Sequence, residues 1–183
     1  NKGGVQKELK LNFTESELEF INTFSLLHTS VFSHLEKELP LLQQYIDISF
    51  DFSTRYDKDY LELVCPYIKF AIFSGGDLTN VECEALIARV HQLGTPNIIV
   101  TRGSEGSLFS DSKQLYKQGI VETEVVDTLG AGDTFVAIFL KEYVLSGNAE
   151  EAMEKGAAAA SETCQRFGAF GHGKKRAKRI TIG

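Results

Sequence analysis

The sequence DTLGAGD at residues 127–133 interrupts the chain and is followed by an apolar stretch that runs to Gly147. Two of its residues, Gly130 and Gly132, can adopt backbone conformations closed to other residues and leave their amide hydrogens uncovered. The pattern predicts a loop that opens a long helix. Because the first turn of a helix has unpaired N–H groups and a partial positive charge, residues 130–133 are predicted to bind an anion.

Asp133 is expected in the same helical turn as this anion site. A phosphoryl group in transfer carries negative charge on its oxygens, which N–H groups of Gly130, Ala131 and Gly132 would stabilise. The Asp133 carboxylate could accept the proton of an attacking hydroxyl. These residues therefore fit phosphoryl transfer from ATP to an alcohol. A tight turn with Asp133 as a helix cap is the alternative for so short a glycine motif.

Strand-like and helix-like segments alternate through the rest of the chain. Strands are expected at residues 26–32, 46–52, 68–73 and 97–101, and helices at residues 14–24, 35–45, 57–65, 81–93 and 149–166. This alternation predicts crossover units and an α/β fold with a mostly parallel sheet covered by helices on both faces. Residues 106–111 and 114–119 are predicted to form an antiparallel hairpin at one edge of that sheet.

Length and composition describe one globular domain of 183 residues, with 43% hydrophobic and 24% charged residues. No stretch approaches the roughly 18 to 20 apolar residues that cross a bilayer, so we expect a cytoplasmic protein without a membrane partner. The net charge of −6 argues against a nucleic-acid partner. The basic tail at 174–183 is interpreted as a solvated chain end, with an arm for an acidic partner as the alternative.

The chain has three cysteines, which are odd in number and widely spaced in the sequence. They predict neither a disulfide framework nor a zinc site. We expect them to be small buried apolar residues. Polar residues instead cluster where predicted parallel strands end, at 51–55, 74–77 and 101–106, and again at 127–133. Open parallel sheets bind ligands beyond the carboxyl ends of their strands, so these segments are the predicted ligand site.

The string DTLGAGD, followed by Thr134, Phe135 and an apolar helix, resembles the signature of the PfkB (ribokinase-like) sugar kinases. This resemblance implies a three-layer α/β/α sandwich, ATP and Mg²⁺ as cofactors, and transfer of the γ-phosphate to a sugar hydroxyl. In that family the last Asp of the signature is the catalytic base, which corresponds to Asp133. The glycine segment is the anion hole, which corresponds to residues 130–132.

Two further segments resemble nucleotide-contacting parts of the family. TRGSEG at residues 101–106 is similar to a Thr-x-Gly-x-x-Gly loop whose threonine and glycines meet nucleotide phosphates, which implies that role for Thr101, Gly103 and Gly106. A plain hairpin turn is the alternative. FGA at residues 167–169 resembles a Gly-Ala turn beside the adenine pocket, which implies a nucleotide contact for Gly168.

The segment DFSTR at residues 51–55 resembles the family's Asp-x-Asn-x-Arg pattern, with Ser53 in place of Asn. The resemblance implies that Arg55 contacts a phosphate as a forked donor. An ordinary surface arginine is the alternative.

Three residues are implied as metal ligands by the same resemblance. SGGD at residues 74–77 falls where the family has Asn-x-x-Glu, which organises Mg²⁺, and implies Asp77 although both residues depart from the pattern. Asp127 and Thr128 match positions that help bind K⁺ near the anion hole in potassium-activated members.

Within the family the chain resembles fructosamine kinases of the fructoselysine 6-kinase type, on residues 50–53, Ser74 and the spacing from Glu8 through Phe32. This likeness implies a sugar or sugar-amine substrate. The resemblance matches only the later part of a family member, so residues 1–173 are interpreted as the C-terminal portion of one PfkB domain. We expect uncovered apolar surface, association with a second copy, and little activity of the fragment alone.

Two alternative functions stay open. The acceptor could be a nucleoside or another non-sugar alcohol, because acceptor contacts in the family lie mainly outside the matched region. The chain could also be a nucleotide-binding regulatory module without catalysis, since Ser74 and Asp77 depart from the family pattern.

Overall fold

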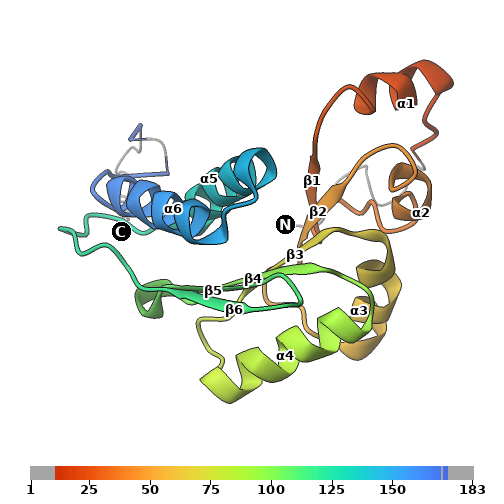
Figure 1. Cartoon of the computed structure of the whole chain (residues 1–183). Coiled ribbons are helices and arrows are strands. Elements are labelled where there is room, and N and C mark those ends of the chain that lie inside the picture. The colour runs from red at the N-terminus through yellow and green to blue at the C-terminus, as the bar shows by residue number, and fades with distance from the viewer. Residues whose placement is uncertain (1–10, 170, 173–183) are drawn as a thin grey trace, which may run out of the picture. The chain divides into compact units, whose positions relative to one another are not determined.

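The computed structural model describes residues 11–169, 171 and 172 and divides the chain into two compact units, Asn1–Gly119 and Ile120–Gly183 (Figure 1). The predicted basic tail at 174–183 and Glu8 lie outside the described residues. Among the residues it describes, no helix is both long and apolar enough to cross a membrane. The assignment of residues 1–173 to a single domain stays a prediction.

The first unit is built on a six-stranded sheet whose spatial order follows the sequence from β1 to β6. Strands β1 to β4 are parallel, and β5 pairs antiparallel with both β4 and β6. The α/β fold with a mostly parallel sheet and an edge hairpin, predicted from the sequence, is therefore confirmed. The strands are β1 (Leu27–Ser30), β2 (Ile48–Asp51), β3 (Phe70–Ser74), β4 (Asn97–Thr101), β5 (Ser107–Ser110) and β6 (Leu115–Gln118).

Helices connect the parallel strands of this unit. Because each right-handed crossover leads to the next strand in the same direction, α3 and α4 lie on one face of the sheet, as Figure 1 shows. Thr14 with Glu17 and Thr79 with Glu82 form capping boxes at the starts of α1 and α4. The helical segments are α1 (Glu15–Ile21), α2 (Leu39–Leu42), α3 (Lys58–Val64), η2 (Cys65–Tyr67), α4 (Asn80–Gln92) and η3 (Gly103–Glu105).

The helix expected at residues 35–45 is only four residues long, α2, and this prediction was wrong in extent. Pro40 lies in its first turn. A helix that began at Leu35 would place the proline ring against the carbonyl of Glu36, so the chain makes isolated turns before residue 39.

The core lies between one face of the sheet and its helices. Phe50, Phe52 and Phe73 are fully buried, and the rings of Phe52 and Phe73 stack with centroids 4.7 Å apart. Alternate residues such as Ile72 and Ile99 point to the opposite face and are also buried. Strands that are apolar on both faces are typical of a parallel sheet.

The second unit contains a helical hairpin of α5 (Ala131–Ser146) and α6 (Ala149–Cys164). Gly147 ends α5 in the left-handed conformation, with φ of 68°, and the Asn148 side chain caps α6. A Cβ at Gly156 would lie 3.0 Å from the ring of Phe135. The small residues of α6 therefore allow close packing on α5, as the sequence predicted.

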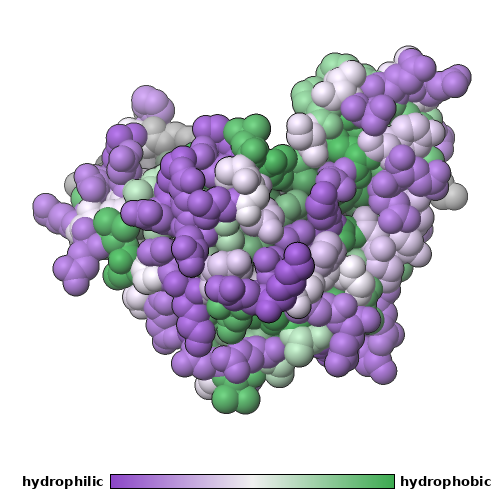
Figure 2. Space-filling model, viewed as in Figure 1, coloured by the Kyte–Doolittle hydropathy of each residue, from purple (hydrophilic) through white to green (hydrophobic). Residues whose placement is uncertain are grey.

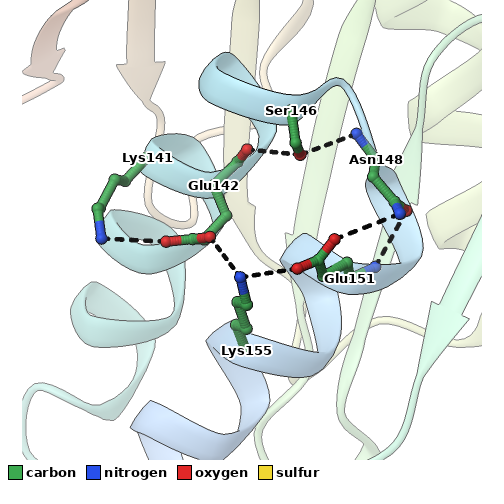
Figure 3. A network of polar contacts seen from close by, with 6 residues as sticks. All are labelled: Lys141, Glu142, Ser146, Asn148, Glu151 and Lys155. Atoms are coloured by element: carbon green, nitrogen blue, oxygen red, sulfur yellow. Dashed lines mark hydrogen bonds and ion pairs between the residues drawn. The ribbon is translucent and has the colours of Figure 1, made fainter.

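Ion pairs connect the two helices of the hairpin at its closed end (Figure 3). The Lys155 ammonium donates to Glu142 on α5 at 2.7 Å and pairs with Glu151 on α6 at 2.8 Å. These hydrogen bonds raise the pKa of Lys155, and the lysine partners lower the pKa of Glu142. The side chains of Lys155 and Glu151 are about half exposed, at 48% each, whereas that of Glu142 is 18% exposed. Salt therefore screens much of this attraction.

Most of the surface in the view of Figure 2 is hydrophilic, with separate hydrophobic areas. Large apolar residues are exposed around the first strand of the sheet: Phe20 is 64% exposed, Phe24 55% and Phe32 66%. The rings of Phe20 and Phe24 contact each other edge to face. All three cysteines are free, and Cys65 and Cys83 are buried as expected, whereas Cys164 is partly exposed.

Candidate active site

The carboxyl ends of β2, β3 and β4 lie side by side, because these strands are parallel and adjacent. Ser74 at the end of β3 pairs in register with Thr101 at the end of β4. The N–H of Gly75 donates to the Thr101 carbonyl at 2.8 Å, and the N–H of Ser74 donates to the Ser53 carbonyl at 2.8 Å. The structure thus brings together the predicted segments 51–55, 74–77 and 101–106 at one edge of the sheet.

The loop 101–106 is compact and depends on its glycines. Gly103 has φ of 56° and Gly106 has φ of 81°, in the region that favours glycine. The N–H of Arg102 donates to the Gly106 carbonyl at 2.8 Å and closes the loop. A Cβ at Gly106 would lie 2.0 Å from the carbonyl oxygen of Gln118. Gly103 is exposed to solvent. The nucleotide contacts of Thr101, Gly103 and Gly106 stay predictions.

Arg55 is held in place by two neighbours. Its Nε donates to Asp57 at 2.9 Å, and its guanidinium carbon lies 3.5 Å above the ring centre of Tyr60. The hydrogen bond from Arg55 lowers the pKa of Asp57, which also caps α3. Burial and a hydrogen bond to Glu36 raise the pKa of Tyr60. The side chain of Arg55 is about half exposed, at 48%, so a phosphate contact stays a prediction that the geometry allows.

Ser53, which stands where the family has Asn, has a positive φ of 55°. Asn adopts this left-handed conformation more readily than Ser, so the turn itself would suit an Asn. Here the N–H of Ser53 donates to the Asp51 carboxylate at 2.7 Å and stabilises the turn.

Asp77 is exposed in the loop that follows β3. Gly75 precedes it, and a Cβ there would lie 2.5 Å from Val100, so the loop packs closely on β4. The Tyr56 hydroxyl donates to the Ser74 carbonyl; burial raises the pKa of Tyr56, and Asp77 adds to this effect. Across the described residues no three His, Cys, Asp or Glu side chains gather as a metal cage. Mg²⁺ commonly needs only one or two carboxylates when phosphate oxygens complete its shell.

Helix α5 starts at Ala131, as the glycine motif predicted, although the Ala131 N–H is paired with the Thr128 carbonyl and is not free for an anion. Gly130 is the N-cap residue, with φ of 81°, and a Cβ there would lie 2.7 Å from that of Ala169. The first helical hydrogen bond runs from the Thr134 N–H to the Gly130 carbonyl at 2.9 Å. The N–H groups of Gly132 and Asp133 precede that bond, and both residues are exposed. An anion could therefore approach this turn beside the Asp133 carboxylate.

The side chain of Asp127, the first residue of the motif, stabilises this turn by hydrogen bonds. One oxygen of its carboxylate accepts the Leu129 N–H at 3.1 Å, and the other accepts the Gly168 N–H at 3.0 Å. These hydrogen bonds, the one from Gly168 first, lower the pKa of Asp127. The carbonyl of Thr128 accepts the Ala131 N–H at 3.2 Å. The structure thus joins Asp127 with Gly168, and a K⁺ site at Asp127 and Thr128 stays a prediction.

Two site features were missed by the sequence interpretation. Arg102 is buried, although a charged residue in a glycine loop is ordinarily expected in solvent. Ala169 contacts Gly130 so closely that only a glycine fits opposite it. Nothing in a single sequence indicates that Arg102 is buried. Ala169 belongs to the predicted Gly-Ala turn at residues 167–169, but the sequence does not show that it packs on Gly130.

Residues 47–172 match the family described as pfkB family carbohydrate kinase. The chain belongs to this family. The match includes the helix start at Gly130 and the loop at 101–106, so both glycine segments fall inside the PfkB region. The family predicted from the DTLGAGD motif is confirmed.

Two PfkB relatives are similar over nearly the whole chain. Fructosamine kinase FrlD of Bacillus subtilis is 45% identical over 173 residues, which cover 94% of this chain and 61% of that protein. Fructoselysine 6-kinase of Shigella flexneri is 30% identical over 171 residues, covering 91% and 63%. The chain thus spans about three fifths of the length of these curated relatives, and the predicted likeness to fructosamine kinases is confirmed.

The fold agrees with solved PfkB structures. A ribokinase of Arabidopsis thaliana, in complex with ribose and ATP, superposes with a TM-score of 0.77 at 21% identity, covering 92% of this chain and 59% of that protein. At this identity the likeness establishes the ribokinase-like fold.

Proposed function

We propose that this chain is the phosphate-handling part of an ATP-dependent sugar kinase that acts on a fructosamine. The start of α5 carries the proposal: exposed N–H groups of Gly132 and Asp133 lie in one helical turn with the Asp133 carboxylate. That turn combines an anion site with a base, which are the two groups that transfer of a phosphoryl group to an alcohol requires.

ATP is the proposed phosphoryl donor. The loop 101–106 offers backbone groups at an edge where parallel strands end, and the helix start at Gly130 offers a site for a phosphate. The solved ribokinase with ATP supports this assignment by fold. Asp77, as a lone exposed carboxylate, fits a role in holding Mg²⁺ through water or directly. Bound Mg²⁺ supplies positive charge to the phosphates.

In the proposed reaction the acceptor hydroxyl gives its proton to an oxygen of Asp133. The acceptor oxygen then forms a bond to the γ-phosphorus of ATP, and the bond between that phosphorus and the bridging oxygen breaks, so ADP leaves. The N–H groups at the start of α5 stabilise charge on the transferred group. The brace from Asp127 to Leu129 and Gly168 holds this turn in place before substrate arrives.

The fructosamine acceptor is supported by the names of the two relatives, fructosamine kinase and fructoselysine 6-kinase. A nucleoside acceptor and a module that binds ATP without catalysis are outcomes of the same test. A panel of fructosamines, free sugars and nucleosides distinguishes the first two.

The test is an ADP-release assay on the protein expressed from its complete gene, with Asp133→Asn as the variant. The substitution keeps the size of the side chain and removes the base, so turnover should fall by about 10² to 10⁴-fold while the affinity for ATP is retained. Unchanged turnover of the variant would remove Asp133 from the mechanism. ATP binding without ADP release for any acceptor would support the regulatory module instead.

A further inference from the structure

Arg102 is the most buried arginine of the first unit, with 8% of its surface exposed, and it lies between the candidate nucleotide residues Thr101 and Gly103. Burying a guanidinium is costly unless its donors are paired. Its two terminal nitrogens are paired with groups of its own loop and of the segment that follows β3, whereas its Nε is buried and has no hydrogen-bond partner among the described residues. This arrangement plays no part in the proposed reaction so far.

The guanidinium reaches across from its own loop to the loop that follows β3. Nη1 donates to the side-chain oxygen of Asn80 at 2.6 Å, and Nη2 donates to the Leu78 carbonyl at 3.0 Å. Leu78 directly follows Asp77, the candidate Mg²⁺ ligand, and Asn80 is the first residue of α4. The planar fork of an arginine can hold both acceptors at once, which a lysine ammonium cannot do in the same geometry.

The same guanidinium also pairs with Glu105 on its own loop. Glu105 is exposed, at 61% of its side chain, so its carboxylate would repel phosphates approaching this loop. The ion pair with Arg102 offsets that charge. One side chain therefore connects two loops and neutralises the acidic residue that lies between Gly103 and Gly106.

We propose that Arg102 is a positioning residue that holds the Asp77 loop and the 101–106 loop in one fixed arrangement, so that both contact the same Mg·ATP. This inference rests on the proposed function. Arg102 itself does not contact the nucleotide. Through Leu78 and Asn80 it positions the loop of Asp77, and through Glu105 it offsets the negative charge of its own loop.

The test compares the affinity for ATP, with and without Mg²⁺, by calorimetry on the protein expressed from its complete gene. Arg102→Leu should weaken Mg·ATP binding about tenfold and reduce the gain in affinity that Mg²⁺ gives. Arg102→Lys should restore part of it, because the charge beside Glu105 returns without the fork. Asn80→Ala, which changes an exposed side chain and should fold, is expected to weaken Mg·ATP binding by roughly threefold.

A control separates positioning from general loss of stability. Val90→Ala removes methyl groups from a fully buried residue of α4, and should destabilise the unit without changing the effect of Mg²⁺. Asp77→Asn completes a double-mutant cycle: combined with Arg102→Leu it should lose no more Mg²⁺ dependence than either variant alone.

Three results would overturn the inference. These are unchanged Mg·ATP binding in both Arg102→Leu and Asn80→Ala, an equal loss of Mg²⁺ dependence in Val90→Ala, or fully additive effects with Asp77→Asn. A wild-type chain that binds no Mg·ATP would overturn the proposed function itself, and the inference with it.

Discussion

The two glycine loops of this chain, residues 101–106 and 127–133, are stabilised in different ways. The first depends on groups at the sheet and at the start of α4: Gly106 packs on the carbonyl of Gln118 at the end of β6, and Arg102 binds Leu78 and Asn80. The second depends on Asp127, which accepts N–H groups from Leu129 and Gly168. A change in the first loop should therefore disturb the sheet, whereas a change in the second should stay near the start of α5.

The largest expected effect on stability follows Gly106→Ala. The new Cβ would lie 2.0 Å from a backbone oxygen, and φ of 81° with ψ of −130° is almost restricted to glycine. Strain and overpacking each cost about 1 to 3 kcal/mol, so unfolding in urea should show a loss of roughly 2 to 6 kcal/mol.

Gly103→Ala is the matched control for that variant. Its φ of 56° is also positive, but a Cβ there meets nothing within 4 Å. Only the strain remains, and we expect a loss of about 1 to 2 kcal/mol. Equal losses for the two variants would show that the contact with Gln118 does not hold the first loop.

The second loop offers a similar pair in Gly130→Ala and Gly132→Ala. Gly130 has φ of 81°, and its new Cβ would lie 2.7 Å from that of Ala169, so we expect a loss of roughly 2 to 4 kcal/mol in urea unfolding. A Cβ at Gly132 meets nothing within 4 Å, and alanine favours the helix by up to about 1 kcal/mol. Gly132→Ala should therefore fold normally. Its ADP release should still fall, because a methyl group now lies at the anion site.

Asp127→Asn tests how much the Asp127 carboxylate stabilises the second loop, measured as the dependence of stability on pH. The lowered pKa of Asp127 means that its contribution to stability is present above about pH 4, the unfolded value, and is lost as the pH falls through the folded pKa. Melting temperatures measured between pH 3 and pH 6 should converge for the wild type and the variant at the acid end. A constant difference across this range would contradict the role of the charge.

The smallest expected effect follows Lys155→Met in the hairpin of the second unit. This removes the ion pairs with Glu142 and Glu151, which Lys155 makes from a half-exposed position where salt screens them. The melting temperature should drop slightly at low salt, and the difference should vanish near 1 M salt. Arg166→Met, at a residue after the end of α6, is a control that should show a weaker salt dependence.

Much of the fold could be predicted from the sequence because its signals are local. The strand at Asn97–Thr101 has the predicted bounds, and the helix predicted to begin at the glycine motif starts at Ala131. The helix predicted at residues 35–45 is present only at Leu39–Leu42, since apolar spacing alone does not include the clash of a proline ring with the preceding turn.

The candidate site was predictable only in part. Residues 130–133 carried a specific motif, and their helix start agrees with it. The burial of Arg102 depends on Leu78 and Asn80, which are more than twenty residues away in the sequence. A single sequence contains no information on such pairings, so the interpretation placed Asp77 and the loop 101–106 in the site without the side chain that connects them.

Ser74 at the end of β3 pairs with Thr101 at the end of β4, so the lengths of these two strands set the positions of the loops that follow them. Inserting one residue into either strand would move its loop by about 3.3 Å and turn each following side chain to the other face. Substitutions in the loops leave this pairing in place, whereas an insertion or deletion in β3 or β4 would displace the loop that follows it.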